Sequence, residues 1–409
     1  MIPRGAPYIS WSDLVAAAMY TVTPGNARAA QKRVETRWAG AAAANSVLCL
    51  SVRSGLDALL QVLDLPPQSE IIVSAITIPH ILDIIARHGL VAVPVDVELN
   101  TLAVGASTVR QAITRSTKAI LIAHLFGSRM PLDEISKLAR ERELLLIEDC
   151  AQANDGSSYR GHPGSDVSMF SFGLIKRQTA LGGALLRFTS SSLAQRVREK
   201  QAAYPRQSRR AYLRRVVTMS AMKFVGLRPV FRVFVSLCKA TGRNHDTSLG
   251  TALRSFSGGD LFVRLRQQPS VPLVRLLERR LSQPATKPIA ERVALVQAVT
   301  TMFPELNRPG ASANHHTHWL FPMLTPDPER LMRHLWTRGF DATCGASNLL
   351  FVPAPNGRAL PAQSMRLMTE VLYLPLFPGA TTTELRELAN AVREHETSFR
   401  DERSLTTVS

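Results

Sequence analysis

The chain has 409 residues, 45% of them hydrophobic, which excludes a globally disordered protein and allows two or three domains. Its net charge is +17, and most of this excess lies in residues 200–280, which contain 17 Lys and Arg but only 3 Asp and Glu. The rest of the chain is close to neutral, and no nucleic-acid-binding motif accompanies the basic segment. We therefore expect no nucleic-acid partner.

The four cysteines form no CxxC pair and do not cluster with histidines at zinc-binding spacing. They predict reduced thiols, no metal site and a cytoplasmic protein. Residues 1–12 lack the apolar run of a signal peptide, and no run of 18 uncharged apolar residues predicts a transmembrane helix.

Residues 1–45 are expected to form an N-terminal helical arm. From 46 to 199 short apolar runs alternate with helical patterns: strands are expected at 47–52, 70–74, 90–95, 119–123, 144–147, 167–171 and 183–188, and helices at 54–63, 79–88, 109–114 and 131–142. This alternation predicts an α/β domain with a mostly parallel sheet covered by helices. Ligands bind such sheets beyond the carboxyl ends of the strands.

The alternation of strand and helix patterns stops in residues 200–285. The composition of this segment predicts a basic, apolar helical insertion. Two interpretations of its segment 208–240 remain open: an insertion packed on a dimer with solvated arginines, or a surface that contacts anionic lipid. Residues 286–409 are expected to form a smaller C-terminal α/β domain. It would hold helices at 291–301, 328–338 and 382–395, a strand at 318–324, an apolar run at 372–376 and a frayed tail from 400.

Four residues at the strand ends could carry chemistry. Lys176 follows a strand in a largely apolar segment, where burial would lower its pKa and favour the neutral nucleophile, although an isolated lysine is more often a surface residue. Asp149 ends another strand and points away from its neighbour Glu148, but it could equally be a turn residue. Ser54 and Gly55 lie between a strand and a helix, where they could bind an anion or cap the helix.

Taken together, these segments resemble the DegT/StrS family of pyridoxal-phosphate (PLP) dependent sugar aminotransferases, over residues 34–188 and again over 286–395. The matching pieces agree in order and spacing. They are Ser54-Gly55-Leu56-Asp57-Ala58-Leu59, Val95-Asp96-Val97, His124-Leu125-Phe126-Gly127, Ile147-Glu148-Asp149-Cys150-Ala151-Gln152, Phe170-Ser171-Phe172 with Lys176, and Leu374-Pro375-Leu376.

The resemblance implies PLP-dependent transferase fold type I, with a large domain and a smaller C-terminal α/β domain. It implies that Lys176 is the Schiff-base lysine and proton shuttle, and that Asp149 faces the pyridine nitrogen. Gln152 matches a residue that contacts the ring hydroxyl. The phosphate cradle matches Ser171 and the Ser54-Gly55-Leu56 turn. The family is dimeric, and each active site is completed by the neighbouring chain.

Several positions depart from the family pattern. Leu56 replaces a threonine, so one phosphate hydroxyl is missing. Ile78 replaces the aromatic residue that stacks on the cofactor, and His80 could stack there instead or serve as a cap. Family members have a motif in which an arginine reaches the cofactor phosphate bound in the partner subunit. This sequence has no clear copy of that motif, and Arg264 is the nearest candidate. The substrate loop around 342–355 is also altered.

The resemblance implies an aminotransferase that moves an amino group from an amino acid, glutamate in the family, to a keto-sugar. The acceptor would be nucleotide-linked, in surface-polysaccharide or secondary-metabolite biosynthesis. One alternative is a family dehydratase, which has histidine where Lys176 stands. Another is a catalytically altered member that acts on a lipid-linked substrate or serves as a membrane-associated, non-catalytic protein at the inner membrane face. The joint presence of Lys176, Asp149 and Gln152 argues against a silent member.

Overall fold

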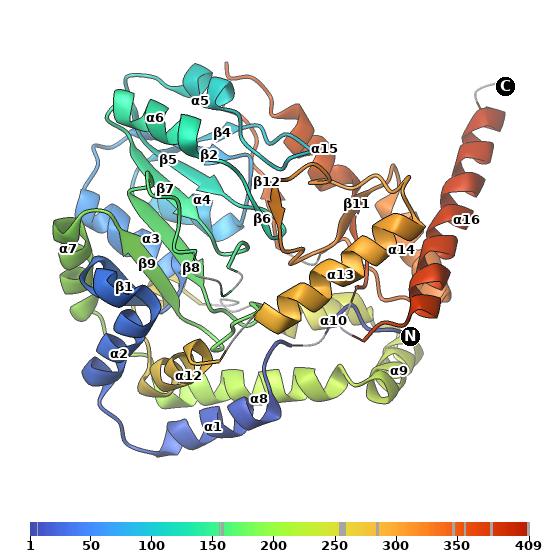
Figure 1. Ribbon diagram of the computed structural model, residues 1–409, viewed down its shortest axis with the longest axis horizontal. Helices are drawn as coiled ribbons and strands as arrows, with labels where there is room; N and C mark the ends of the chain where they lie inside the picture. The colour runs from blue at the N-terminus through green and yellow to red at the C-terminus, as the bar shows by residue number, and fades with distance from the viewer. Residues whose placement is uncertain are drawn as a thin grey trace.

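The computed structural model describes residues 1–5, 7–154, 156, 159–252, 259–283, 286–345, 348–355, 357–376 and 379–406. At its centre lies a seven-stranded sheet (Figure 1). Its strands, in spatial order, are β1 (Ser46–Cys49), β9 (Ala184–Phe188), β8 (Val167–Ser171), β7 (Leu145–Asp149), β5 (Thr117–Ala123), β2 (Glu70–Ser74) and β4 (Val91–Val95). β9 runs antiparallel to both neighbours and the other strands share one direction, which confirms the predicted fold class.

Helices cover both faces of this sheet, which explains why its strands are apolar throughout. One face packs on α3 (Val52–Leu63), α4 (Pro79–Arg87) and α7 (Ser191–Ala202), and the other on α5 (Ala106–Ala112) and α6 (Asp133–Glu141). Ile71 and Ile72 of β2 belong to these two opposite cores, as strand alternation requires.

The N-terminal arm and the middle segment form one further layer below the sheet (Figure 1). The arm contains α1 (Trp11–Val22), α2 (Ala27–Ala39) and the short η1 (Gly40–Asn45). α1 packs against α8 (Arg209–Val225) and α12 (Val271–Leu281), and α2 packs against α12. Buried Asp13 of α1 pairs with Arg279 and Arg280 of α12 at 2.7 and 2.9 Å. Helices of the middle segment therefore form part of the layer that packs against the large domain.

The remainder of the middle segment consists of short helices that reach toward the C-terminal domain. They are α9 (Arg228–Ala240), α10 (His245–Ala252) and α11 (Leu261–Leu265). Pro229 lies in the first turn of α9 and begins that helix rather than bending it. His245 of α10 reaches Asp341 of the small domain at 3.1 Å, which joins the two regions.

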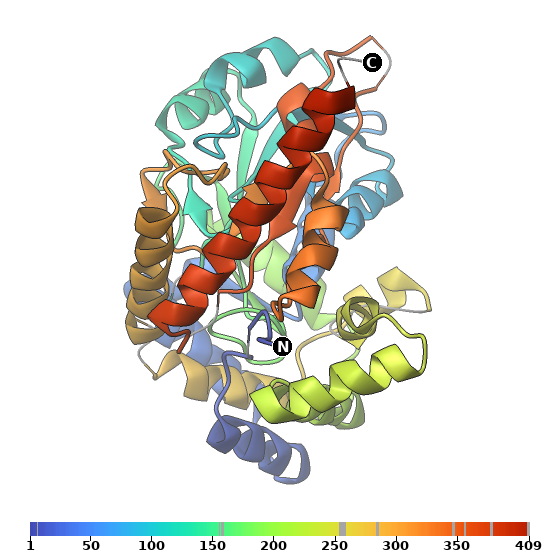
Figure 2. The same cartoon turned by 90° about the vertical axis from the view of Figure 1, so that its right-hand side faces the viewer.

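The C-terminal domain is a small α/β unit. Its helices are α13 (Thr286–Met302), α14 (Pro328–Thr337), α15 (Ala362–Glu370) and α16 (Thr382–Thr406), and β11 (Pro322–Leu324) pairs with β13 (Val371–Tyr373). Figure 2 shows α16 along the outside of this unit, beside α13 and α14. Two short pairings join the domains: β10 (His315–His316) with β6 (Ser128–Arg129), and β12 (Leu350–Phe351) with β3 (Ile76–Thr77).

Two details of the C-terminal domain differ from the prediction. The strand expected at 318–324 is restricted to β11, because His318 has a φ of 51° and turns the chain. The tail expected from Arg400 continues α16 as far as Thr406, and residues 407–409 lie outside the described chain. Within the described residues, no helix is both long and apolar enough to cross a membrane.

Candidate active site

Lys176 lies in the turn after β8, at the carboxyl edge of the sheet. Burial lowers the pKa of its amine to about 7, with a further decrease from Arg53, and Asp149 opposes both effects. Its Nζ lies 3.9 Å from the centroid of the Trp319 ring, so the amine faces an aromatic surface. Near neutral pH a large fraction of this lysine is the neutral amine that a nucleophile requires.

Asp149 ends β7 next to this lysine. Burial raises the pKa of its carboxyl group, while a hydrogen bond of 2.8 Å from the Ala151 amide and the charge of Lys176 lower it. A positive group beside Asp149 would favour its ionised form. The structure brings Lys176 and Asp149 together, as the sequence predicted.

Arginine side chains also converge on this region. Arg53, in the first turn of α3, is 2.8 Å from Nδ1 of His80, and it acts electrostatically on Asp149 and Lys176. Arg264 of α11 and Arg215 of α8 are close enough to Arg53 to lower its pKa, which burial brings to about 10. A cation at a helix N-terminus opposes the helix dipole, so this concentration of positive charge favours an anionic ligand.

His80 and Arg264 thus lie at the same end of the sheet as Lys176. The His80 ring hydrogen-bonds Arg53, and burial together with Arg53 lowers its pKa. Arg264 lies near Arg53 and His80 of its own chain, where its charge lowers the pKa of both side chains. Stacking by His80 and phosphate binding by Arg264 stay predictions.

The Ser54-Gly55-Leu56 segment lies inside α3 rather than in the turn before it. Ser51 is the N-cap and accepts from the Ser54 amide at 3.1 Å, so the predicted capping role of Ser54 is wrong. Gly55 donates its amide to Ser51, and a Cβ there would lie 2.7 Å from Leu186. Leu56 is fully buried. Close helix–sheet packing therefore explains the glycine, and phosphate contact by this segment stays a prediction.

Gln152 and Ser171 lie on the same edge. The Gln152 side chain accepts from the Phe126 amide at 2.8 Å and so holds the turn at Phe126 and Gly127, which both have positive φ. Ser171 ends β8, and its hydroxyl accepts from the Gly173 amide at 3.3 Å. The predicted cofactor contacts of Gln152 and Ser171 stay predictions.

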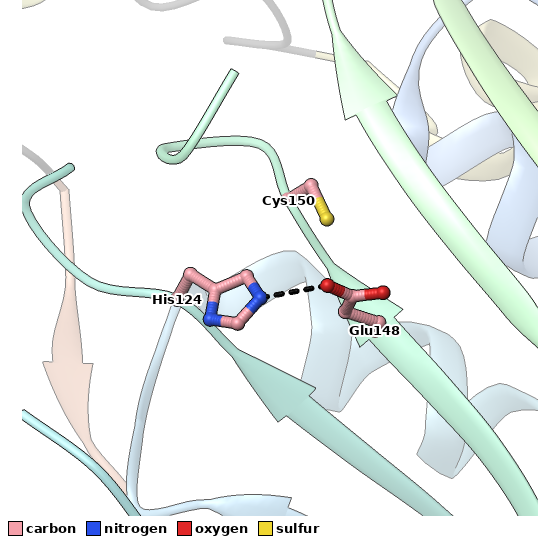
Figure 3. A group of neighbouring side chains, drawn as sticks. All are labelled: His124, Glu148 and Cys150. Atoms are coloured by element: carbon pink, nitrogen blue, oxygen red, sulfur yellow. Dashed lines mark hydrogen bonds and ion pairs between the residues drawn. The ribbon is translucent and has the colours of Figure 1, made fainter. Parts of the chain in front are cut away.

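A second buried group lies next to Asp149, formed by His124, Glu148 and Cys150 (Figure 3). Nε2 of His124 is 2.8 Å from Glu148, and its Nδ1 accepts from the Met130 amide. Glu148 also accepts from the Ser168 hydroxyl, the His162 amide and the Tyr159 hydroxyl. Burial raises the pKa of the Cys150 thiol well above its usual value. The histidine and carboxylate already have protein partners, so this group is a structural hydrogen-bond network.

The residues at the edge of the sheet fit PLP. Several positive side chains lie near the carboxylate of Asp149, and such a set is suited to a phosphate dianion and a protonated ring nitrogen. Sequence reasoning missed Arg53 and Trp319. Arg53 directly precedes Ser54 and its position was a usable signal, whereas Trp319 reaches Lys176 from the other domain and no local pattern marks it.

Comparison with known proteins gives a consistent result. Residues 31–223 match the model of the DegT/DnrJ/EryC1/StrS aminotransferase family. Over 157 residues the chain is 39% identical to the erythromycin biosynthesis sensory transduction protein EryC1 of Saccharopolyspora erythraea. This match covers 37% of this chain and 43% of that protein. Over 97 residues it is 41% identical to a dTDP-4-dehydro-2,6-dideoxy-D-glucose 3-dehydratase of Saccharopolyspora spinosa, covering 24% and 21%. These matches span less than half of either relative.

The whole fold has a counterpart among solved structures. The aminotransferase TlmJ of Streptoalloteichus hindustanus superposes with a TM-score of 0.70 at 18% identity, covering 98% of this chain and 100% of that chain. At this identity the superposition shows the fold alone. It confirms the predicted arrangement of a large sheet domain and a smaller C-terminal domain.

Proposed function

We propose that the chain is a PLP-dependent aminotransferase, because residues 31–223 match the model of the DegT/DnrJ/EryC1/StrS aminotransferase family. The observation that carries the proposal is the desolvated amine of Lys176 beside the buried carboxyl of Asp149. The dehydratase alternative, raised again by the relative from S. spinosa, is opposed by this lysine. The proposed acceptor is a keto-sugar linked to a nucleotide, and glutamate is the donor that the family resemblance implies.

Each side chain has a distinct part in this reaction. Bound PLP supplies an electron-withdrawing ring that stabilises negative charge on the substrate carbon. Lys176 is the amine that holds the cofactor and, when free, the base that takes and returns the proton on that carbon. Asp149 would face the ring nitrogen and favour its protonated form, and the positive charge there would favour the ionised form of this buried carboxyl group.

The phosphate would bind at the start of α3. The Ser54 and Gly55 amides already donate to Ser51, so we assign the phosphate contact in this turn to the Arg53 guanidinium, which also contacts His80. Arg264 and Ser171 would complete this region, Gln152 would reach the ring hydroxyl, and His80 would lie against the ring. The cluster of arginines offsets the phosphate charge in a buried setting.

The direct test is the absorption spectrum of the purified protein with PLP. The wild type should develop a visible band that Lys176→Ala lacks, and glutamate should bleach it. Lys137→Ala, which changes an exposed lysine on α6, should behave as the wild type. A wild-type spectrum identical to that of Lys176→Ala would refute the proposal.

A homodimer is part of the proposal. The family resemblance implies sites shared between chains, yet Arg264 already acts on Arg53 of its own chain. We therefore propose that the dimer contributes to substrate binding and that the chain itself supplies Arg264. Light scattering should give twice the chain mass, and Arg264→Gln should weaken PLP binding without changing that mass. A monomeric mass with full activity would exclude the dimer.

We further propose that this cytoplasmic protein contacts the inner membrane face through residues 208–240. The large apolar side chains Val217 on α8 and Val233 and Leu237 on α9 are 60%, 59% and 60% exposed, and the same helices carry much of the positive charge. Vesicles with phosphatidylglycerol should co-sediment the protein, and vesicles of phosphatidylcholine alone should not. Val217→Ser with Val233→Ser should reduce this binding; equal binding to both vesicle types would contradict the proposal.

A further inference from the structure

A cavity of about 230 Å³ lies between the N-terminal segment, the middle helices and the small domain. The middle helices supply Met219 and Met222 from α8, Phe231 from α9 and Leu249 from α10. Both α9 and α10 come after residue 223, where the match to the family model ends. Part of this wall is therefore built by a segment outside the family match.

One charged side chain in this wall has no matching charge. Arg292 of α13 is only 6% exposed, and its Nε donates to the carbonyl oxygen of His318 at 2.9 Å. Throughout the part of the chain that the structure describes, no carboxylate pairs with it. Burying a guanidinium without a counter-ion is costly, and a bound anion would remove that cost.

The other arginine in the wall already has its counter-ions. Arg4 pairs with Asp341 at 2.6 Å and also with Asp246. Asp341, which lines the cavity as well, receives a further contact from His245 at 3.1 Å. Arg4 and Asp341 therefore neutralise each other, and Arg292 is the group in the wall that would attract an anion.

The surroundings of Arg292 favour an anion too. The rings of His316 and His318 stack on each other next to it, and burial lowers the pKa of these two rings to about 3 and about 2. The charges of Arg292, Arg308 and Arg177 lower both values further. A bound anion at Arg292 would thus lie in a positive field.

The rest of the wall limits what this anion can be. Met222, Phe231 and Phe321 present apolar surface to the cavity. An engineered apolar cavity of about 150 Å³ is enough to bind benzene, so a branched aliphatic chain or one aromatic ring fits here. A second charged group would lose its hydration against this surface without compensation. The wall therefore suits a monocarboxylate with an apolar body.

The reactive amine lies outside this cavity. Neither Lys176 nor Asp149 lines it, whereas Ile175 and Trp319 do. The Trp319 ring is 3.9 Å from Nζ of Lys176, and its indole nitrogen donates to the Ile175 carbonyl at 3.2 Å. A bound molecule would not reach the amine, but it would contact the aromatic ring that the amine faces.

We propose that this cavity is an effector site for a small apolar monocarboxylate, with the carboxylate paired to Arg292 and the hydrocarbon body packed on α8 and α9. The bound acid takes no part in amino transfer, and its binding is independent of the proposed aminotransferase function. Only its effect on Lys176 rests on that function. An acid packed against Trp319 would hold the ring over the amine, so it should slow the reaction of Lys176 with PLP.

Calorimetry with 4-methylpentanoate tests the binding. This acid has neither an amino nor an oxo group, so it cannot be a reactant in transamination. Acetate keeps the carboxylate without the apolar body, and 4-methylpentan-1-ol keeps the body without the charge. We expect the acid to bind at least about ten-fold more tightly than either. Acetate or the alcohol binding as tightly as the acid would overturn the proposal.

Variants of Arg292 test the assigned contact. Arg292→Leu should lower the affinity for 4-methylpentanoate by about ten-fold and leave that for the alcohol unchanged, which also shows that the cavity is intact. Arg292→Lys keeps the charge and should retain most of the affinity. Arg366→Leu, which changes an exposed arginine on α15, is the matched control. Equal affinity of wild type and Arg292→Leu for the acid would overturn the proposal.

The rate of PLP uptake tests the effect on Lys176. Saturating 4-methylpentanoate should slow uptake by the wild type by about five-fold or more, at the lower end of usual coupling between sites, and should not slow uptake by Arg292→Leu. An unchanged wild-type rate with the acid bound would refute the effector role.

The same measurements separate the two proposals. Lys176→Ala should bind the acid as the wild type does, because the amine does not line the cavity. A protein that binds the acid through Arg292 but forms no lysine-dependent absorption band would refute the aminotransferase function alone. A normal band without acid binding would refute the effector site alone.

Discussion

Two adjacent carboxylates at the end of β7 lie in opposite kinds of surroundings. Glu148 accepts hydrogen bonds from His124, Ser168 and the His162 amide, and these hold its pKa well below its usual range. Asp149, one residue later on the other face of the strand, has the Ala151 amide and the partly neutral Lys176, and burial raises its pKa.

The difference in hydrogen-bond donors assigns Glu148 a structural role, and it supports the predicted chemical role of Asp149. A buried carboxylate with several donors stabilises the fold and has no reason to change its protonation state. A buried carboxylate with few donors stays ionised only while a positive group faces it, which is the requirement that a cofactor nitrogen would meet. We therefore expect changes on the Glu148 side to lower stability and changes on the Asp149 side to lower activity.

The largest expected effect is that of Asp149→Asn. Because the amide cannot keep a ring nitrogen protonated, transamination should slow by roughly 10³-fold, in the range of general acid–base effects. Thermal unfolding should change little, since the neutral side chain suits a buried site. Asp133→Asn, at an exposed carboxylate, should leave the rate unchanged. A large drop in unfolding temperature for Asp149→Asn would show that Asp149, like Glu148, mainly stabilises the fold.

Glu148→Gln should instead lower the free energy of unfolding, by about 3 kcal/mol, since it breaks a buried charged network. Urea unfolding measures this. The wild-type advantage should be fully present above the ordinary glutamate pKa and should disappear as the pH falls, because the folded pKa of Glu148 is depressed. A variant with unchanged stability but lost activity would show that Glu148 belongs to the chemistry.

Gly127→Ala should cost about 2–3 kcal/mol and disturb the contact between Trp319 and Lys176. Gly127 has a φ of 100°, and an added Cβ would lie 2.5 Å from the backbone nitrogen of Trp319. Gly339→Ala is the control, because its φ is 87° but nothing lies within 4 Å of its Cβ position. Equal losses of unfolding free energy in the two variants would show that backbone strain alone, and not the Trp319 approach, is involved.

The smallest expected effect concerns pH. Since the pKa of Lys176 is about 7, the rate of PLP uptake should rise about ten-fold per pH unit below 7 and level off above it. Arg53 contributes to this lowering, so Arg53→Gln should move the midpoint upward by less than about one unit. Stopped-flow absorbance gives the midpoint, and a downward shift would contradict the assigned charge effect.

Local patterns were sufficient for much of the large domain. Apolar runs located the sheet strands because both faces of a parallel sheet are buried, and motif spacing placed Lys176 and Asp149 at neighbouring strand ends. They failed where the reason for a residue is distant in the chain. Gly55 also packs closely on Leu186, which no local pattern marks, and its phosphate contact stays a prediction. The substrate loop 342–355 is described except at 346 and 347, and β12 within it pairs with β3.

The sequence by itself therefore determined the fold class and placed Lys176 and Asp149 at neighbouring strand ends, because periodicity and short-range spacing record burial and strand ends. Only the tertiary structure decided what surrounds them. Trp319 and Arg292 come from the C-terminal domain, and Arg53 becomes part of a cluster only when α8 and α11 fold against α3. Charge balance and cavity shape are sums over residues far apart in the chain, so no local pattern contains them.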